Sequence, residues 1–238
     1  DILMFTSLRF REYRIFWIGN ATSNIGIWLL GAGRLWLMYD LTDSEIMLGL
    51  VTFANLVPIL VLSMWGGVIA DRVNRVKLVT VTRAMFAFTA ILTGLLIFSD
   101  LILPWHLIAI SLVNGVLLSF DIPCRQAIVP NLVPLKHLVN AVSLQSMLGS
   151  GSAVIGPSML PIMIRFWNIE GVFFFIGGMY IFTTLMFAKL KTQPISRESK
   201  SNSPLKDLLS GLSYIKHNHI IIALISIGVT SGLFASSL

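Results

Sequence analysis

The segment 66–77 places one carboxylate and several bases at fixed spacing behind a pair of glycines. Asp71 can accept hydrogen bonds from the N-terminus of a neighbouring helix, where the helix dipole favours an anion. Arg72 and Arg75 can pair with a nearby carboxylate, and Gly67 allows a second helix to approach closely. A simpler interpretation is a tight basic turn that only fixes membrane topology, but that turn requires neither the glycines nor Asp71.

A second polar segment, residues 120–130, contains Asp121 and Arg125. The apolar tracts that end at Asp71 and at Asp121 run toward the same face if the chain crosses a membrane. We therefore predict a latch in which Asp71 and Arg72 contact Asp121 when the inner gate is shut. A water-exposed pair of this kind contributes at most about 1 kcal/mol, and partial shielding strengthens it.

Small residues form a stripe along one face of the tract 141–165 and include Gly149, Gly151 and Gly156. Glycines at this spacing allow close contact between helices. Pro157 follows directly, and it frees a backbone carbonyl and bends a helix. The residues by themselves favour a packing seam with a kink.

Polar residues in the tract 15–39 include Asn20, Asn24 and Arg34, which share about a 100° arc of one helix. Polar groups are costly in lipid, so we predict that this face lines a central cavity. Arg34 can equally extend to the outer membrane surface. The predicted cavity includes three side chains from other tracts, which can alternatively join helices by hydrogen bonds: Asn55, Asn114 and Gln145.

Other residues that could do chemistry are sparse. Cys124 is the single cysteine, and no familiar metal-binding, phosphate-binding or catalytic motif is found. We therefore predict no catalytic residue, no metal and no cofactor. All eleven acidic residues are assigned to loops or to the ends of tracts, which leaves Arg34 as the one charge inside a tract. The coupling ion stays open, with Asp40, another end carboxylate or a group beyond this chain as candidates.

The composition of the 238 residues is that of a polytopic membrane protein. Hydrophobic residues make up 55% and charged residues 12%, about half the charge of a soluble domain. This excludes an ordinary soluble enzyme, a disordered chain and a disulfide-stapled chain. The net charge of +6 agrees with basic cytoplasmic loops, so no nucleic-acid partner is expected.

Six apolar tracts are long enough to cross about 30 Å of hydrocarbon as helices. They are residues 15–39, 48–70, 78–98, 104–120, 141–165 and 171–188. We predict an all-α fold with a six-helix bundle over 1–190. A cytoplasmic linker with an amphipathic surface helix follows over 191–218, and a seventh membrane helix begins at 219–238.

Fifteen of the seventeen Lys and Arg residues fall on one side of this arrangement. The basic side of a membrane protein is cytoplasmic. We therefore predict a cytoplasmic N-terminus and a cytoplasmic linker in a protein of the cell membrane.

The signature segment 66–77 resembles the loop G-x-x-x-D-R/K-x-G-R-R/K of the major facilitator superfamily, with Asn74 and Val76 as departures. Segments 23–26, 39–42, 120–130 and 205–214 are similar to enterobactin exporter-like and macrolide-efflux-like carriers. The resemblance implies a 12-helix secondary transporter, of which this chain is the N-terminal half with the interdomain loop and helix 7. The glycine stripe also resembles the superfamily's antiporter motif, although Leu160 and Pro161 replace its last two glycines.

The resemblance implies an exporter of amphipathic small molecules, drug-like or siderophore-like, that works by alternating access and is coupled to protons. Expected partners are the substrate and membrane lipid, and the full-length protein is expected to be a monomer. An importer or a lysolipid carrier on the same fold is the main alternative. A membrane-embedded enzyme would need clustered Asp, His or Cys at the membrane face, which the sequence lacks.

Overall fold

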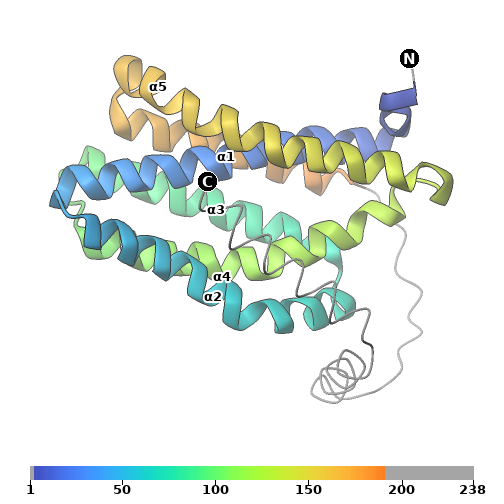
Figure 1. Ribbon diagram of the computed structural model, residues 1–238, viewed down its shortest axis with the longest axis horizontal. Helices are drawn as coiled ribbons and strands as arrows, with labels where there is room; N and C mark the ends of the chain where they lie inside the picture. Colours follow the sequence, from blue (N-terminus) through green and yellow to red (C-terminus); the bar gives the residue numbers. More distant parts are fainter. Residues whose placement is uncertain (1–2, 191–238) are drawn as a thin grey trace. The chain divides into compact units, whose positions relative to one another are not determined.

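The computed structural model describes residues 3–190, apart from the side chains of residues 3–5, 64, 68 and 70–72. This part of the chain is helical and contains no strand, which confirms the predicted all-α membrane fold. The long helices run side by side in one bundle (Figure 1). Their bounds are α1 Arg11–Thr42, α2 Glu45–Arg72, α3 Arg75–Phe98, α4 Pro104–Ile128 and α5 Leu138–Ala188, with short 3-10 turns at Leu3–Arg9, Val129–Asn131 and Leu135–His137.

Helix α5 contains two passes rather than one. Asn168 interrupts it with φ 56° and ψ 179°, and the chain doubles back there (Figure 1, yellow to orange). Asp43 and Asp100 also have positive φ values, 46° and 54°, after α1 and α3. Asn and Asp tolerate this region better than other side chains. The turns after α1, after α3 and between the two passes of α5 lie at the same end of the bundle (Figure 1).

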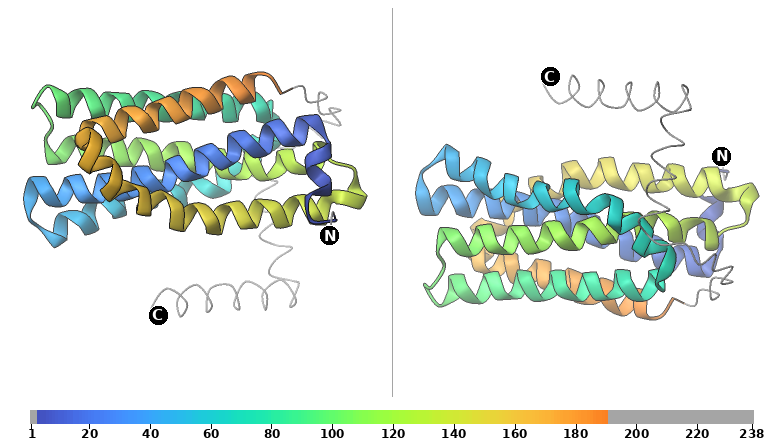
Figure 2. Two further views of the ribbon diagram at one scale, coloured as in Figure 1. Left: turned by 90° about the horizontal axis from the view of Figure 1, so that it is seen from above. Right: turned by 90° about the horizontal axis from the view of Figure 1, so that it is seen from below.

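Within residues 3–190, four helical stretches are long and apolar enough to cross a membrane: Glu45–Ser63, Arg75–Phe98, Pro104–Asn131 and Leu135–Ala188. The last of them includes the reversal at Asn168. Helix α1 is not among the four, because polar residues such as Asn20 and Asn24 lower its mean hydropathy. With α1 and both passes of α5, the described part of the chain has six passes, which lie side by side in Figure 2.

The long helices extend further than the predicted apolar tracts, as α3 and α4 show. Helix α4 continues to Ile128, although the tract was predicted to end at Phe120. Helix α3 starts at Arg75, three residues before the predicted tract. Hydropathy marks where a helix stops being apolar, whereas the backbone hydrogen bonds continue until the chain has to turn. The predicted linker, surface helix and seventh helix over 191–238 lie outside the described residues.

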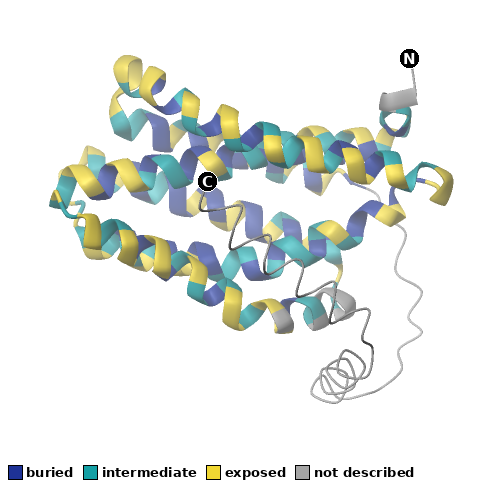
Figure 3. Cartoon of the chain, viewed as in Figure 1, coloured by how far each residue is buried: buried dark blue, intermediate teal, exposed yellow. Residues whose placement is uncertain are grey.

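The helices pack in fixed pairs: α1 against α5, α2 against α4, and α3 against both α4 and α5. Two apolar clusters make up the core. One includes Leu29, Phe86 and Tyr180, and the other includes Tyr13 and Phe187. Figure 3 shows these buried positions between the helices and the exposed positions on the outer faces. Large apolar side chains such as Phe53 and Leu60 are exposed there, as lipid contact requires.

Glycines allow α2 and α4 to touch backbone to backbone. A Cβ atom at Gly66 would overlap the carbonyl oxygen of Ser119, and one at Gly115 would overlap the carbonyl oxygen of Asn55. In lipid there is no hydrophobic driving force for helices to associate, so close packing contacts of this kind hold them together instead. The two glycines therefore fix the distance between α2 and α4.

Candidate functional site

A buried ion pair joins α3 to α4. Nη2 of Arg83 lies 2.9 Å from Oδ2 of Asp121, and both side chains are 0% exposed. The hydroxyl of Thr82 donates a hydrogen bond of 2.9 Å to the other carboxylate oxygen. A carboxylate this deep requires such partners, because an unpaired buried charge is strongly destabilising.

Arg125 extends the pair toward α1. It follows Asp121 by one helical turn, and its Nε lies 3.6 Å from Oδ2 of that residue. Its Nη1 donates to the side-chain oxygens of Asn20 at 2.9 Å and of Asn24 at 3.2 Å. The planar guanidinium thus bridges two helices through several hydrogen bonds.

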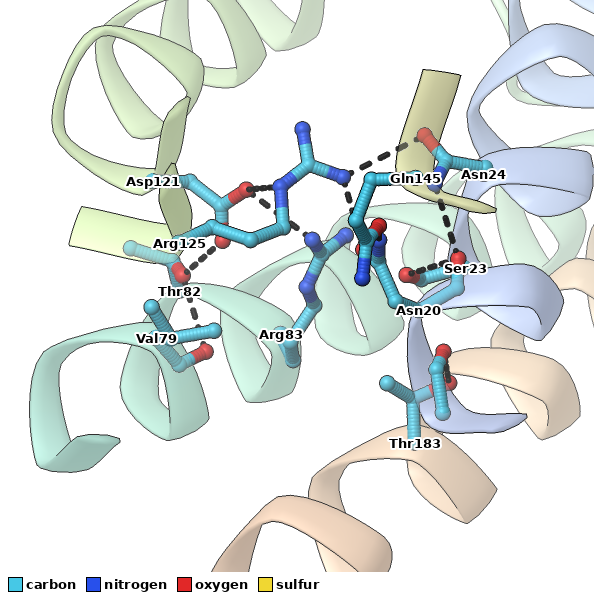
Figure 4. A network of polar contacts seen from close by, with 11 residues as sticks. Asn20, Ser23, Asn24, Val79, Thr82, Arg83, Asp121, Arg125, Gln145 and Thr183 are labelled. Carbon is cyan, nitrogen blue, oxygen red and sulfur yellow. Dashed lines mark hydrogen bonds and ion pairs between the residues drawn. The ribbon is translucent and has the colours of Figure 1, made fainter. Parts of the chain in front are cut away.

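Gln145 brings α5 into the same cluster. Its side-chain oxygen accepts a hydrogen bond from the amide nitrogen of Asn20. The polar network formed by Asn20, Asn24, Thr82, Arg83, Asp121, Arg125 and Gln145 is drawn in Figure 4. It therefore connects α1, α3, α4 and α5.

The network forms a polar layer between the two apolar clusters. Along α1, Phe16 belongs to one cluster and Leu29 to the other, on either side of the asparagines. Along α3, Val79 and Phe86 flank the network in the same way. The ring of Tyr180 lies 5.9 Å from the guanidinium carbon of Arg83, within range of a cation–π contact.

The network carries more positive than negative charge. It contains two guanidinium groups and a single carboxylate. Arg83 keeps Nε and Nη1 without hydrogen-bond partners among the described residues, and Nε2 of Gln145 and the hydroxyl of Tyr180 are also unpartnered. An unsatisfied buried donor costs about 1–3 kcal/mol, so the site has hydrogen-bonding capacity for a ligand or water.

The chain matches the family described as transmembrane secretion effector over residues 3–238. It belongs to this family of major facilitator transporters. It is 30% identical to the staphyloferrin A transporter of Staphylococcus aureus over 189 residues, which cover 78% of this chain and 47% of that protein. It is 19% identical to macrolide efflux protein A of Streptococcus pyogenes over 219 residues, which cover 91% of the chain and 54% of that protein.

The chain spans about half the length of these curated relatives. An uncharacterised facilitator-type transporter of Bacillus subtilis shows the same coverage, with 24% identity over 207 residues and 48% of its length matched. No solved structure matches the chain. The family and the apolar helices establish a multi-pass membrane protein.

Five of the predicted site residues lie together in the polar network: Asn20, Asn24, Asp121, Arg125 and Gln145. Asn55 and Asn114 make other contacts. Asn55 donates to the backbone oxygen of Ser111 at 3.1 Å, and Asn114 accepts a bond of 3.0 Å from Thr89. Both contacts join neighbouring helices, as the alternative interpretation of these asparagines expected.

Arg34 lies on α1 away from the network's ion pairs. Its Nε and Nη1 are buried and have no hydrogen-bond partner among the described residues. The residue as a whole is only partly buried, and these two donors remain free. Whether it lines a cavity or reaches the outer surface stays a prediction.

The signature segment connects α2 to α3. Arg75 donates from Nη1 to the backbone oxygen of Ala127 at 3.0 Å, which ties the segment to the end of α4. Asn74 caps α3 by accepting a bond of 3.1 Å from the backbone nitrogen of Lys77. A Cβ at Gly67 would meet nothing within 4 Å. The side chains of Asp71 and Arg72 lie outside the described residues, so the predicted latch stays a prediction.

The glycine stripe of α5 divides into two kinds of position. A Cβ at Gly156 would come within 2.7 Å of the Cβ of Trp28, so α1 and α5 are in close contact there. Cβ atoms at Gly149 and Gly151 would meet nothing within 4 Å. Pro157 lies inside α5, one residue after the tight contact.

The sequence interpretation was wrong about buried charge. It placed Arg83 and Asp121 at the ends of tracts and left Arg34 as the only charge inside one. Arg83 and Asp121 are in fact buried within helices. They can be buried there because each neutralises the charge of the other. A signal was present, since Arg83 lies five residues inside the predicted tract 78–98.

Proposed function

We propose that the full-length protein is a secondary active transporter that exports amphipathic small molecules by alternating access and is coupled to protons. It lies in the cytoplasmic membrane with its N-terminus inside, and it carries drug-like or siderophore-like molecules. The relatives named for a siderophore and for macrolide efflux support this substrate range.

The observation that carries the proposal is the charged layer inside a bundle of membrane helices. Arg83 and Asp121 are fully buried, and Arg125 is close to them. Ionisable residues inside a membrane bundle are rare and generally mark a substrate or ion pathway. Apolar side chains at these positions would stabilise a bundle equally well, so stability alone does not require the charged residues.

Asp121 is a candidate for the proton-coupling group. Among the acidic side chains that the structure describes, it alone is buried. A change in its protonation would alter its contacts with Arg83 and Arg125, which join α3 and α4. Transport coupled to protons therefore has a buried carboxylate available in this half of the protein.

The experiment is an accumulation assay in cells that express the full-length protein and lack their own efflux pumps. Two chemically different probes are used, labelled erythromycin and carboxyfluorescein. Export predicts that expressing cells accumulate less of at least one probe, and that a proton uncoupler abolishes the difference. Higher accumulation in expressing cells would instead support the importer alternative. Unchanged accumulation of both probes, with a vesicle assay showing lysolipid movement, would support the lysolipid carrier.

The proposed latch between Asp71, Arg72 and Asp121 gives a separate prediction. Arg72→Lys keeps the charge but loses the two-pronged geometry of the guanidinium. A loss of about 1.4 kcal/mol shifts a two-state gate tenfold, so we expect a several-fold lower initial efflux rate at unchanged protein level. Arg11→Lys, at the exposed start of α1, is the matched control. Equal rates in Arg72→Lys and wild type would leave only a topological role for Arg72.

A further inference from the structure

The unpartnered polar atoms of the bundle share one chemical property. Among the described residues, all buried side-chain polar atoms without a hydrogen-bond partner are N–H nitrogens except one hydroxyl, which can also donate. They belong to Trp17, Arg34, Arg83, Asn114, Gln145 and Tyr180. A ligand that completes these contacts must therefore supply acceptor atoms.

The acceptors of the polar network are already in use. Both carboxylate oxygens of Asp121 have partners, from Thr82 and Arg83. The amide oxygens of Asn20 and Asn24 accept from Arg125, and that of Gln145 accepts from Asn20. A cationic ligand would find only engaged acceptors and a net positive charge.

We propose that this network binds a carboxylate group of the transported molecule, with Arg83, Arg125 and Gln145 as the donors. This inference rests on the proposed transport function and names the substrate class. Two guanidiniums against one carboxylate leave a formal charge of +1, which a single carboxylate neutralises. Guanidinium groups bind carboxylates in a two-pronged geometry. A phosphate has a charge of about −1.5 to −2, which is more negative charge than the network needs to become neutral.

Three members of the network are partly exposed. The side chain of Arg125 is 16% exposed, whereas that of Asp121 is 0% exposed. Asn24 and Gln145 are also only partly buried. Arg125 is therefore the guanidinium of the network that is accessible from outside the bundle, whereas Arg83 is fully enclosed.

The test measures anion binding by the purified full-length protein in detergent, at constant ionic strength and without transport. The probe is succinamate, the monoamide of succinate, which carries a single carboxylate, and the diamide succinamide is the uncharged control. Binding to the folded state raises the melting temperature in proportion to the logarithm of ligand concentration above Kd. We expect such a logarithmic rise with succinamate and none with succinamide.

Variants locate the site. Arg125→Gln is expected to raise the apparent Kd for succinamate at least tenfold, and Arg125→Lys by a smaller factor because the charge remains. Arg165→Gln removes one exposed positive charge from α5 and is expected to keep the wild-type Kd. The melting temperature without probe reports whether each variant is folded. If Arg125→Gln does not fold, the test compares the apparent Kd of Arg125→Lys with that of Arg165→Gln. Only Arg125→Lys is then expected to show a raised Kd.

The proposal is overturned if succinamate and succinamide act alike, if inorganic phosphate binds more tightly than succinamate, or if folded Arg125 variants keep the wild-type Kd. Efflux of the probes without succinamate binding would overturn the carboxylate site alone. Succinamate binding that depends on Arg125, without export from cells, would contradict the exporter and leave the site standing.

Discussion

Asp121→Asn is expected to lower the free energy of unfolding of the full-length protein by about 3–5 kcal/mol. The substitution leaves Arg83 buried at 0% exposure without its carboxylate partner. It also removes a charge contact of Arg125. The loss is measurable as a lower midpoint in thermal or denaturant unfolding of the purified protein in detergent.

A double variant separates the contribution of the ion pair to stability from the contribution of side-chain packing. Arg83→Met combined with Asp121→Leu removes both charges and keeps much of the volume, so it should be more stable than Asp121→Asn alone. Asp100→Asn, at an exposed turn after α3, is the single-charge control and should keep the wild-type midpoint. Wild-type stability in Asp121→Asn would show that Arg83 does not depend on that carboxylate.

Gly115→Ala is expected to lower the free energy of unfolding by about 1–3 kcal/mol. The new Cβ would overlap the carbonyl oxygen of Asn55, and a backbone atom cannot rotate away. Alanine gains about 1 kcal/mol in helix propensity, which reduces the measured loss. Gly66→Ala should act in the same direction, because its Cβ would overlap the carbonyl oxygen of Ser119.

The matched control is Gly178→Ala in α5, where a Cβ would meet nothing within 4 Å. It should be neutral or slightly stabilising in the same unfolding experiment. If Gly115→Ala and Gly178→Ala behave alike, α2 and α4 can move apart without loss, and the glycines do not set their spacing.

The sequence by itself determined the fold class and the family. The apolar composition excludes a soluble domain, and the tracts mark the passes, because about 20 apolar residues are needed to cross the membrane. The segment 66–77 indicated the superfamily from a few residues at fixed spacing. These signals are local, so they can be read along the chain without knowledge of how the helices pack.

Only the tertiary structure decided which charges are buried. Arg83 and Asp121 are 38 positions apart, and each by itself looks like a polar residue near a helix end. They can lie inside the bundle because each neutralises the other once α3 and α4 pack together. In the same way Gly115 is one glycine among eighteen until the backbone of α2 lies against it. Pairing energies and steric contacts depend on distances between helices, which hydropathy and spacing along the chain do not contain.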